Sequence, residues 1–258
     1  MEQFINKIIN DDCFNILPKI ESSSIDLILI DPPYNILDAG FDKDKIDFNL
    51  LFNNLKRIIK NNKCIILTCV QPLTSKIIYN NINYFKHHYI WNKLRGYGFH
   101  LIKYKPMMQT EDIIVLCNGK PITYNAQKIK RIKPIKYSFC SSKSIANPLC
   151  GLLNYTYISN FTYTTNLLSY KKDHICLHPT QKPVALFEHL IKTYSNKNDL
   201  VLDCFSGCGT TAIASINTQR NFICIEKDKK YYNESIRRLD DYQQKETKQG
   251  IKFRIIGQ

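Results

Sequence analysis

The sequence predicts an α/β protein with a doubly wound, mostly parallel sheet and one inserted region. Short apolar runs rich in Ile, Leu and Val alternate with amphipathic helical patterns, as expected when helices cover both faces of a parallel sheet. The 258 residues are enough for one large α/β domain with an insertion, and two full domains are not expected. Residues that carry chemistry directly follow two of the apolar runs.

The expected strands are apolar along their whole length, which is typical of strands buried on both faces. They cover residues 26–30, 64–69, 112–116, 200–203 and 221–225. Between them, two sets of apolar residues have helical spacing, so each set forms a stripe on one side of a helix. The first set is Leu51, Leu55, Ile58 and Ile59, and the second is Val184, Phe187, Leu190, Ile191 and Tyr194.

The middle of the chain, from residue 120 to about residue 175, has no clear periodicity and carries tyrosines among Lys, Asn, Ser and Thr. A structureless loop of this length is unusual inside a compact domain, so we expect a small inserted module or a binding surface. Tyrosine beside cationic and amide side chains suits base stacking and phosphate contact. An adaptable surface without a ligand is the alternative.

The formal net charge of +14 and the pI of about 9.2 favour a polyanionic partner, with nucleic acid as the leading candidate. A compositional bias towards Lys and Asn would produce the same charge. No apolar run approaches the roughly 18 residues of a membrane helix, and the first ten residues lack the apolar core of a signal peptide. We therefore expect an intracellular protein without a membrane anchor.

The ten cysteines are scattered and form no C-x-x-C pair with a second half-site. This spacing favours buried thiols in a reducing compartment. No metal is expected.

The first chemical motif is Asp31-Pro32-Pro33-Tyr34, which directly follows the apolar run of residues 26–30. In open α/β sheets ligands bind beyond the carboxyl ends of the strands, so the motif is expected to form a rigid rim of an active site. An exocyclic amine of adenine or cytosine is a poor nucleophile, and Asp31 and the Pro32 carbonyl are suitable acceptors for its N–H groups. Tyr34 offers a face for stacking a flipped-out base. The alternative is a turn that only ends a strand.

The second motif runs from Asp203 to Thr211 and also follows an apolar run. Gly207 and Gly209 let the backbone approach a ligand closely, and residues 212–216 are expected to belong to a helix whose N-terminus faces the site. The next apolar run ends at Glu226, where a carboxylate can bond both hydroxyls of a ribose. This arrangement indicates a nucleoside site, and the alternative is a purely structural turn.

With His178-Pro179-Thr180-Gln181-Lys182-Pro183, these motifs resemble the amino-methylating DNA methyltransferases of the circularly permuted β group. In that family an Asp-Pro-Pro-Tyr half, a target-recognition region and a cofactor half follow one another, as they do here. The segments 11–14, 91–93 and 111–115 agree, whereas residues from about 128 to 175 match no family pattern. The resemblance implies a Rossmann-like methyltransferase fold with a catalytic half at 1–119, a recognition region at 120–177 and a cofactor-binding half at 178–258.

The resemblance also implies a role for each matching residue. Those assigned to S-adenosylmethionine are Asp12 and Cys13 at the adenine, Glu226 at the ribose, Phe205, Gly207 and Gly209 along the pocket, Asp203 and Thr210 near the methionine end, Lys182 at its carboxylate, and Asp31. The catalytic residues are Asp31, Pro32, Pro33 and Tyr34. For Lys182 and Asp12, a solvated charge or a helix cap is the alternative. Gln109-Thr110 stands where the family often has a histidine, which puts one local hydrogen bond in doubt.

The expected reaction is direct methyl transfer to N6 of adenine in a DNA duplex whose target base is flipped out. Cytosine C5 is disfavoured because no Pro-Cys pair presents a nucleophile. Cytosine N4 stays open, although the family more often pairs it with Ser-Pro-Pro-Tyr. An RNA or protein-glutamine methyltransferase usually has Asn in place of Asp31, and a non-catalytic DNA-binding relative is expected to have lost the glycines or Glu226. A homodimer is reasonable by resemblance, and the recognition sequence and any restriction partner stay open.

Overall fold

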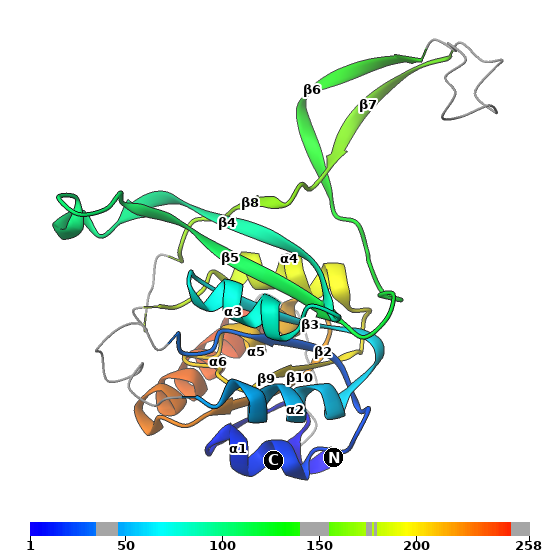
Figure 1. Cartoon of the computed structure of the whole chain (residues 1–258). Coiled ribbons are helices and arrows are strands. Elements are labelled where there is room, and N and C mark those ends of the chain that lie inside the picture. Colours follow the sequence, from blue (N-terminus) through cyan, green and yellow to red (C-terminus); the bar gives the residue numbers. More distant parts are fainter. Residues whose placement is uncertain (35–45, 140–154, 174–176, 178–179, 249–258) are drawn as a thin grey trace. The chain divides into compact units, whose positions relative to one another are not determined.

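The computed structural model describes residues 1–34, 46–139, 155–173, 177 and 180–248 (Figure 1). The chain forms two compact units, one made of residues 1–125 with 166–258 and the other of residues 126–165. The first unit carries an eight-stranded sheet and the second a two-stranded sheet. Parts of the expected recognition region (140–154 and 174–176), residues 178–179 of the segment 178–183 and the end of the cofactor half (249–258) lie outside the described residues.

The strands are β1 (Lys7–Asn10), β2 (Ile25–Ile30), β3 (Ile59–Cys69), β4 (Phe85–Tyr97), β5 (Met108–Cys117), β6 (Lys128–Phe139), β7 (Tyr155–Tyr163), β8 (Leu167–Ser169), β9 (Leu200–Asp203) and β10 (Asn221–Glu226). The α-helices are α1 (Cys13–Ile16), α2 (Phe48–Ile58), α3 (Leu73–Asn80), α4 (Val184–Tyr194), α5 (Thr210–Asn217) and α6 (Lys229–Lys248). Short 3-10 turns lie at η1 (Glu2–Phe4), η2 (Leu17–Lys19) and η4 (Phe99–Leu101).

The large sheet has the strand order β1-β10-β9-β2-β3-β5-β4-β8. From β1 to β3 all neighbours are parallel, and β5 runs antiparallel to both β3 and β4. The predicted α/β fold with a mostly parallel sheet is thereby confirmed. The expectation that residues 112–116 belong to the parallel part is wrong, because β5 forms a hairpin with β4 and hairpin strands are antiparallel.

Helices cover both faces of this sheet, which makes it doubly wound. Along β2, Ile28 and Ile30 belong to the core beneath α1, α2 and α3, whereas Leu27 and Leu29 belong to the core beneath α4 and α5. This alternation follows from the two-residue period of a strand. It explains why β2 is apolar at almost every position and why all six residues are buried.

The structure differs from the sequence analysis at two further places. The helical stripe was expected to include Ile59, but α2 ends at Ile58 and the backbone of Ile59 is extended, so Ile59 begins β3. The edge strand β1 was not expected, because it has only four residues and begins and ends on polar side chains, Lys7 and Asn10. It pairs in parallel with β10.

The smaller unit is an antiparallel hairpin formed by β6 and β7. It lies in the stretch for which the sequence predicted a small module. Tyr137 and Tyr157 are opposite one another in the register and their rings stack, with centroids 5.1 Å apart. Isolated hairpins are marginally stable, so cross-strand ring pairs of this kind contribute to its stability.

Candidate active site

Three carboxylates meet at the carboxyl edge of the sheet. The neighbouring parallel strands β10 and β9 end at Glu226 and Asp203, and Asp31 follows directly after the next strand, β2. Because the carboxyl ends of parallel strands lie at one edge, the two sequence motifs converge although they are far apart in the chain.

The glycine loop after β9 forms a cradle beside Glu226. The Gly207 N–H donates to Glu226 Oε2 at 2.7 Å, and the Asp228 N–H donates to Glu226 Oε1 at 2.8 Å. Gly207 has a left-handed backbone, with φ of +52°, and a Cβ built there meets no heavy atom within 4 Å. Burial raises the pKa of Glu226. The loop therefore borders open space next to a carboxylate that keeps free acceptor capacity.

Gly209 starts α5 and is also left-handed, with φ of +79°. A Cβ built there would lie 3.1 Å from the Cβ of Ser235, so a side chain is disfavoured by conformation and by space. Thr210 follows, and its hydroxyl lies 3.4 Å from the Lys182 carbonyl and accepts from Arg238 at 3.2 Å. The helix start is thus joined to the segment that carries Lys182.

Asp203 lies at the bottom of the cradle and is buried. Its carboxylate accepts from the Phe205 N–H at 3.0 Å and from the Thr211 hydroxyl. Burial outweighs these hydrogen bonds and raises the pKa of Asp203 from 3.8 to about 7. This side chain therefore exchanges its proton close to neutral pH.

Because the pKa of Asp203 is raised in the folded chain, the stability that it contributes is present below 3.8 and is lost as the pH rises towards about 7. Asp203→Asn carries no ionisable group, so we expect its free energy of unfolding to fall less than that of the wild type over this window. Urea unfolding at several pH values measures the difference. Parallel curves for the two proteins would contradict the raised pKa.

Asp31 lies in a cluster of hydrogen-bonding side chains. Its Oδ1 accepts from the Tyr34 hydroxyl at 2.8 Å and from the Thr68 hydroxyl at the end of β3. Its Oδ2 accepts from Lys182 Nζ at 2.7 Å. Lys182 Nζ also lies 5.5 Å from the centre of the Tyr34 ring. The Asp31 carboxylate is thus held in one orientation at the rim of the site.

Lys182 joins Asp31 to a chain of alternating charges. Its Nζ lies 3.3 Å from Glu111 Oε2, and Lys93 Nζ lies 2.7 Å from Glu111 Oε1. We call Asp31, Lys182, Glu111 and Lys93 the Lys182 network. Burial disfavours the charged forms of Lys182 and Glu111. The attraction of Asp31 and Glu111 nevertheless raises the pKa of Lys182, and the attraction of Lys182 and Lys93 lowers the pKa of Glu111. Lys182 and Glu111 therefore both stay charged at neutral pH.

The structure brings most of the sequence-predicted residues to this edge. Asp31 and Tyr34 share a hydrogen bond, Pro32 and Pro33 lie between them, and Phe205, Gly207 and Gly209 form the loop that ends beside Glu226. Lys182 contacts Asp31 and Glu111 rather than solvent, so the alternative of a solvated charge is wrong. Its expected contact with a cofactor carboxylate stays a prediction.

Asp12 and Cys13 lie after β1, next to β10. Asp12 caps α1 by accepting from the Phe14 N–H at 2.9 Å, and Lys227 Nζ lies 3.3 Å from its other oxygen. Cys13 is buried. The cap that was an alternative for Asp12 is therefore present, and a role at an adenine ring stays a prediction.

Sequence reasoning gave no role to Thr68, Glu111 or Lys93, although the last two lie in segments that match the family. Thr68 is a polar residue near the end of an otherwise apolar strand, at the same edge as Asp31, and that position is the signal that could have found it. Glu111 lies on β5 and Lys93 on β4, which pair in an antiparallel register with irregularities. The apolar pattern of each strand alone does not show which residues of the two strands lie opposite each other.

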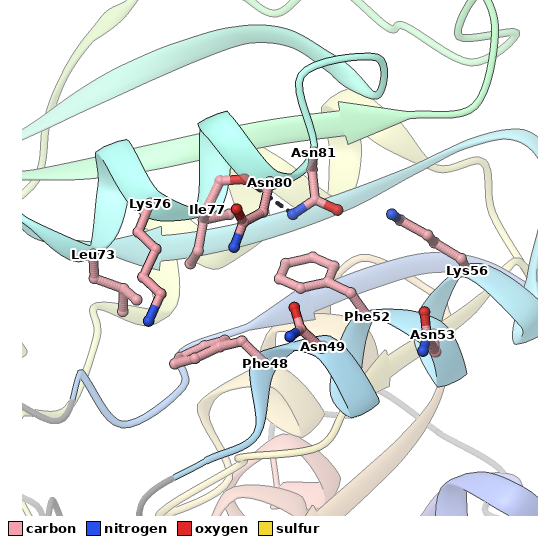
Figure 2. Close-up of a pocket in the computed structure, with 10 residues that line it drawn as sticks. All are labelled: Phe48, Asn49, Phe52, Asn53, Lys56, Leu73, Lys76, Ile77, Asn80 and Asn81. Atoms are coloured by element: carbon pink, nitrogen blue, oxygen red, sulfur yellow. Dashed lines mark hydrogen bonds between the residues drawn. The ribbon is translucent and has the colours of Figure 1, made fainter.

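A groove of about 230 Å³ lies between α2 and α3, and Figure 2 shows its lining of aromatic, amide and lysine side chains. None of the sequence-predicted site residues lines it. Among the described residues, no group of three or more His, Cys, Asp or Glu side chains could hold a metal ion. No helix in the described part of the chain is long and apolar enough to cross a membrane.

The carboxyl edge of the sheet combines the glycine cradle with two carboxylates, Glu226 at the end of β10 and Asp31 after β2. This combination defines an α/β enzyme site for a nucleoside-type ligand. A family model described as DNA methylase matches residues 25–237, which is most of the chain. The chain belongs to this DNA methylase family, which spans N6 and N4 amino-methylating enzymes.

Among curated relatives, the type II methyltransferase M1.MboII of Moraxella bovis is 30% identical over 90% of this chain and 95% of its own length. M.HpaI of Haemophilus parainfluenzae is 30% identical over 91% of this chain and 74% of its own. The DNA adenine methyltransferase YhdJ of Escherichia coli strain K12 is 28% identical over 90% of this chain and 82% of its own length.

Solved structures agree in fold. M1.HpyAVI has a TM-score of 0.62 and 24% identity, covering 91% of this chain and 98% of its own. The cytosine-N4-specific PvuII DNA methyltransferase has a TM-score of 0.64 and 15% identity, and the match covers 89% of this chain and 84% of that chain. At these identities the likeness shows the fold alone.

Proposed function

We propose that this chain transfers the methyl group of S-adenosylmethionine to the exocyclic N6 of adenine in a specific DNA sequence. One observation carries the proposal: the Asp31 carboxylate and the glycine cradle of Asp203 to Gly209 follow directly neighbouring parallel strands. A methyl donor bound in the cradle and a methyl-accepting amine bound at Asp31 can therefore meet at one sheet edge.

The residues of the cradle fit the proposed cofactor. Open space above Gly207 accommodates a ligand, and Glu226 retains lone pairs for the two hydroxyls of a ribose. When bound, S-adenosylmethionine supplies an electrophilic methyl group on a sulfonium. In this assignment Asp12 and Cys13 would border the adenine, and Phe205 and Gly209 would line the pocket. Asp203 and Thr210 would face the methionine end, and Lys182 would pair with its carboxylate.

On the other side of the site, Asp31 and the Pro32 carbonyl accept the N–H groups of the target amine. This contact orients the nitrogen lone pair and stabilises the positive charge that develops on the nitrogen. Tyr34 stacks on the flipped-out base, because the amine is inaccessible inside a duplex. The hydrogen bond to Thr68 and the pair with Lys182 hold Asp31 ready for this role.

Adenine is favoured over cytosine N4 by the aspartate at position 31, and the printed name of the relative YhdJ gives adenine for that protein. Duplex DNA within the cell is the proposed substrate, and a homodimer is the proposed assembly on resemblance alone. The surplus of Lys and Arg, which gives a net charge of +14, suits this polyanionic partner.

The test uses purified protein, S-adenosylmethionine with a tritiated methyl group and unmethylated bacterial DNA. After digestion to nucleosides, we expect the label in N6-methyladenine. Label in N4-methylcytosine would contradict the choice of base. An absence of label from DNA, with labelled RNA or protein instead, would contradict the substrate.

A further inference from the structure

Between β4 and β5 the chain extends past its neighbours in the sheet and ends in a folded projection, which we call the β4–β5 tip and define as residues 94–107 (Figure 1). The tip has a defined backbone. Leu101 donates to the Gly98 carbonyl at 2.8 Å, and Tyr104 donates to the Leu101 carbonyl at 2.9 Å. A Cβ built on Gly96 would lie 2.8 Å from Met107 Cε, so the two sides of the tip are closely packed.

Despite this order, the tip exposes large apolar side chains. Phe99 is 71% exposed and Tyr104 is 86% exposed, and Leu94, Ile102 and Met107 are exposed as well. Clustered exposed apolar groups on an ordered element are typical of an interaction surface. The chemistry of the remaining residues indicates which partner this surface fits.

The tip contains Arg95, Lys103 and Lys105 together with His100, and it contains no acidic residue. Aromatic rings interleaved with cations suit nucleic acid, since rings stack on bases and cations contact phosphates. A surface for a protein partner is less consistent with this one-sided charge.

The tip is also attached directly to the site. β4 runs parallel to β2, so the tip leaves the sheet at the carboxyl edge where Asp31 lies. Lys93, the residue before the tip, belongs to the Lys182 network, and its Nζ lies 5.3 Å from the centre of the Tyr97 ring. The projection therefore starts at the Lys182 network, which holds the proposed catalytic carboxylate.

We propose that the β4–β5 tip is a DNA-contacting element that stacks Phe99 and Tyr104 on bases next to the target and places Lys103 and Lys105 on the flanking phosphates. The inference rests on the proposed function and adds a surface to it. Apolar side chains that insert between base pairs partially unstack them, and a base that has lost its stacking neighbour leaves the duplex more readily. Phe99 and Tyr104 thus assist the extrusion of the target base without touching the reacting atoms.

The test uses a short duplex that carries the methylated sequence, identified by sequencing DNA modified by the wild type, with 2-aminopurine in place of the target base. Fluorescence rises when this base leaves the stack. We expect Phe99→Ala/Tyr104→Ala to lose most of the rise and to lower kcat/KM on natural DNA about tenfold or more. Lys103→Gln/Lys105→Gln is expected to reduce the slope of log affinity against log salt by about 2.

A matched control is Tyr79→Ala, because Tyr79 is 82% exposed but lies near the end of α3, which runs back from the carboxyl edge. This variant is expected to behave as the wild type. All variants are first checked for unchanged S-adenosylmethionine affinity, which reports an intact cradle.

If Phe99→Ala/Tyr104→Ala matches the wild type in both fluorescence and kcat/KM, the inference is wrong while the proposed function stands. If this variant instead changes the mass of the particle in sedimentation and leaves DNA affinity unchanged, the tip is a protein contact and the inference is again wrong. If the wild type itself transfers no methyl group to any DNA, the proposed function fails.

Discussion

Asp31→Ala is expected to lower the rate of methyl transfer to DNA by about 10² to 10³-fold, the usual effect of removing one oriented group that stabilises developing charge. In the structure Asp31 is held by Tyr34, Thr68 and Lys182 at the end of β2. Because the contact strengthens as charge develops on the amine, kcat and kcat/KM should fall together. Transfer of the tritiated methyl group to DNA measures both.

Tyr34 offers a matched pair of variants for this prediction. Tyr34→Phe keeps the ring for stacking and removes the hydroxyl, which hydrogen-bonds to Asp31 and Thr68 and accepts from Lys182. Tyr34→Ala removes the ring as well. We expect a small loss for phenylalanine and a loss close to that of Asp31→Ala for alanine. Wild-type rates for Asp31→Ala, with S-adenosylmethionine still bound, would contradict the role of this carboxylate.

Lys182→Met is expected to lower the free energy of unfolding by about 3 kcal/mol, because it removes one partner from a buried network of ion pairs. The Lys182 side chain is only 3% exposed and lies between Asp31 and Glu111. Among the described residues, its loss leaves Asp31 without a paired cation and Glu111 with Lys93 alone. Methyl transfer should fall as well, since Asp31 loses the contact that orients it.

Lys63→Met provides the control for a merely structural effect. Lys63 is also buried and pairs with Asp26 and Asp199, but these residues lie at the start of β2 and just before β9, at the opposite edge of the sheet. We expect a comparable loss of stability with kcat unchanged in the folded fraction. Equal losses of kcat in Lys63→Met and Lys182→Met would contradict a specific role for Lys182.

The pH dependence adds a second check on Lys182. The pKa of Glu111 is lowered in the folded chain, so its stabilising contribution is present above its unfolded value of 4.5 and is lost as the pH falls. The difference in stability between the wild type and Lys182→Met should therefore narrow in acid. The double variant Lys182→Met/Glu111→Gln should recover part of the lost stability, because it removes a carboxylate that has lost one of its cations.

Much of this molecule follows from local sequence physics. Strands such as β2 and β9 are buried on both faces and are therefore apolar throughout, which makes them visible in a sequence, and the motifs that follow them are placed by the geometry of a parallel sheet. The short edge strand β1 carries no such signal. The boundary at Ile59 was missed because an apolar residue continues the helical stripe equally well when the next strand begins there.

In the candidate site, too, some residues could be predicted from the local sequence and others could not. Asp31, Asp203 and Glu226 could be predicted because each follows an apolar strand. The Lys182 network could not be predicted in full, because it joins β4, β5 and the residues before α4, and these pairings depend on the antiparallel register of a hairpin. The β4–β5 tip was missed because exposed aromatic residues have no periodicity.

The most direct test of the account is single-molecule sequencing of DNA from cells that express either the wild-type chain or Asp31→Ala. If the carboxylate at the end of β2 and the glycine cradle after β9 form one methyl-transfer site, wild-type cells carry modified adenine in one sequence context and the variant cells do not. Unmodified DNA in wild-type cells that contain folded protein, or the same modification in both, would contradict that claim.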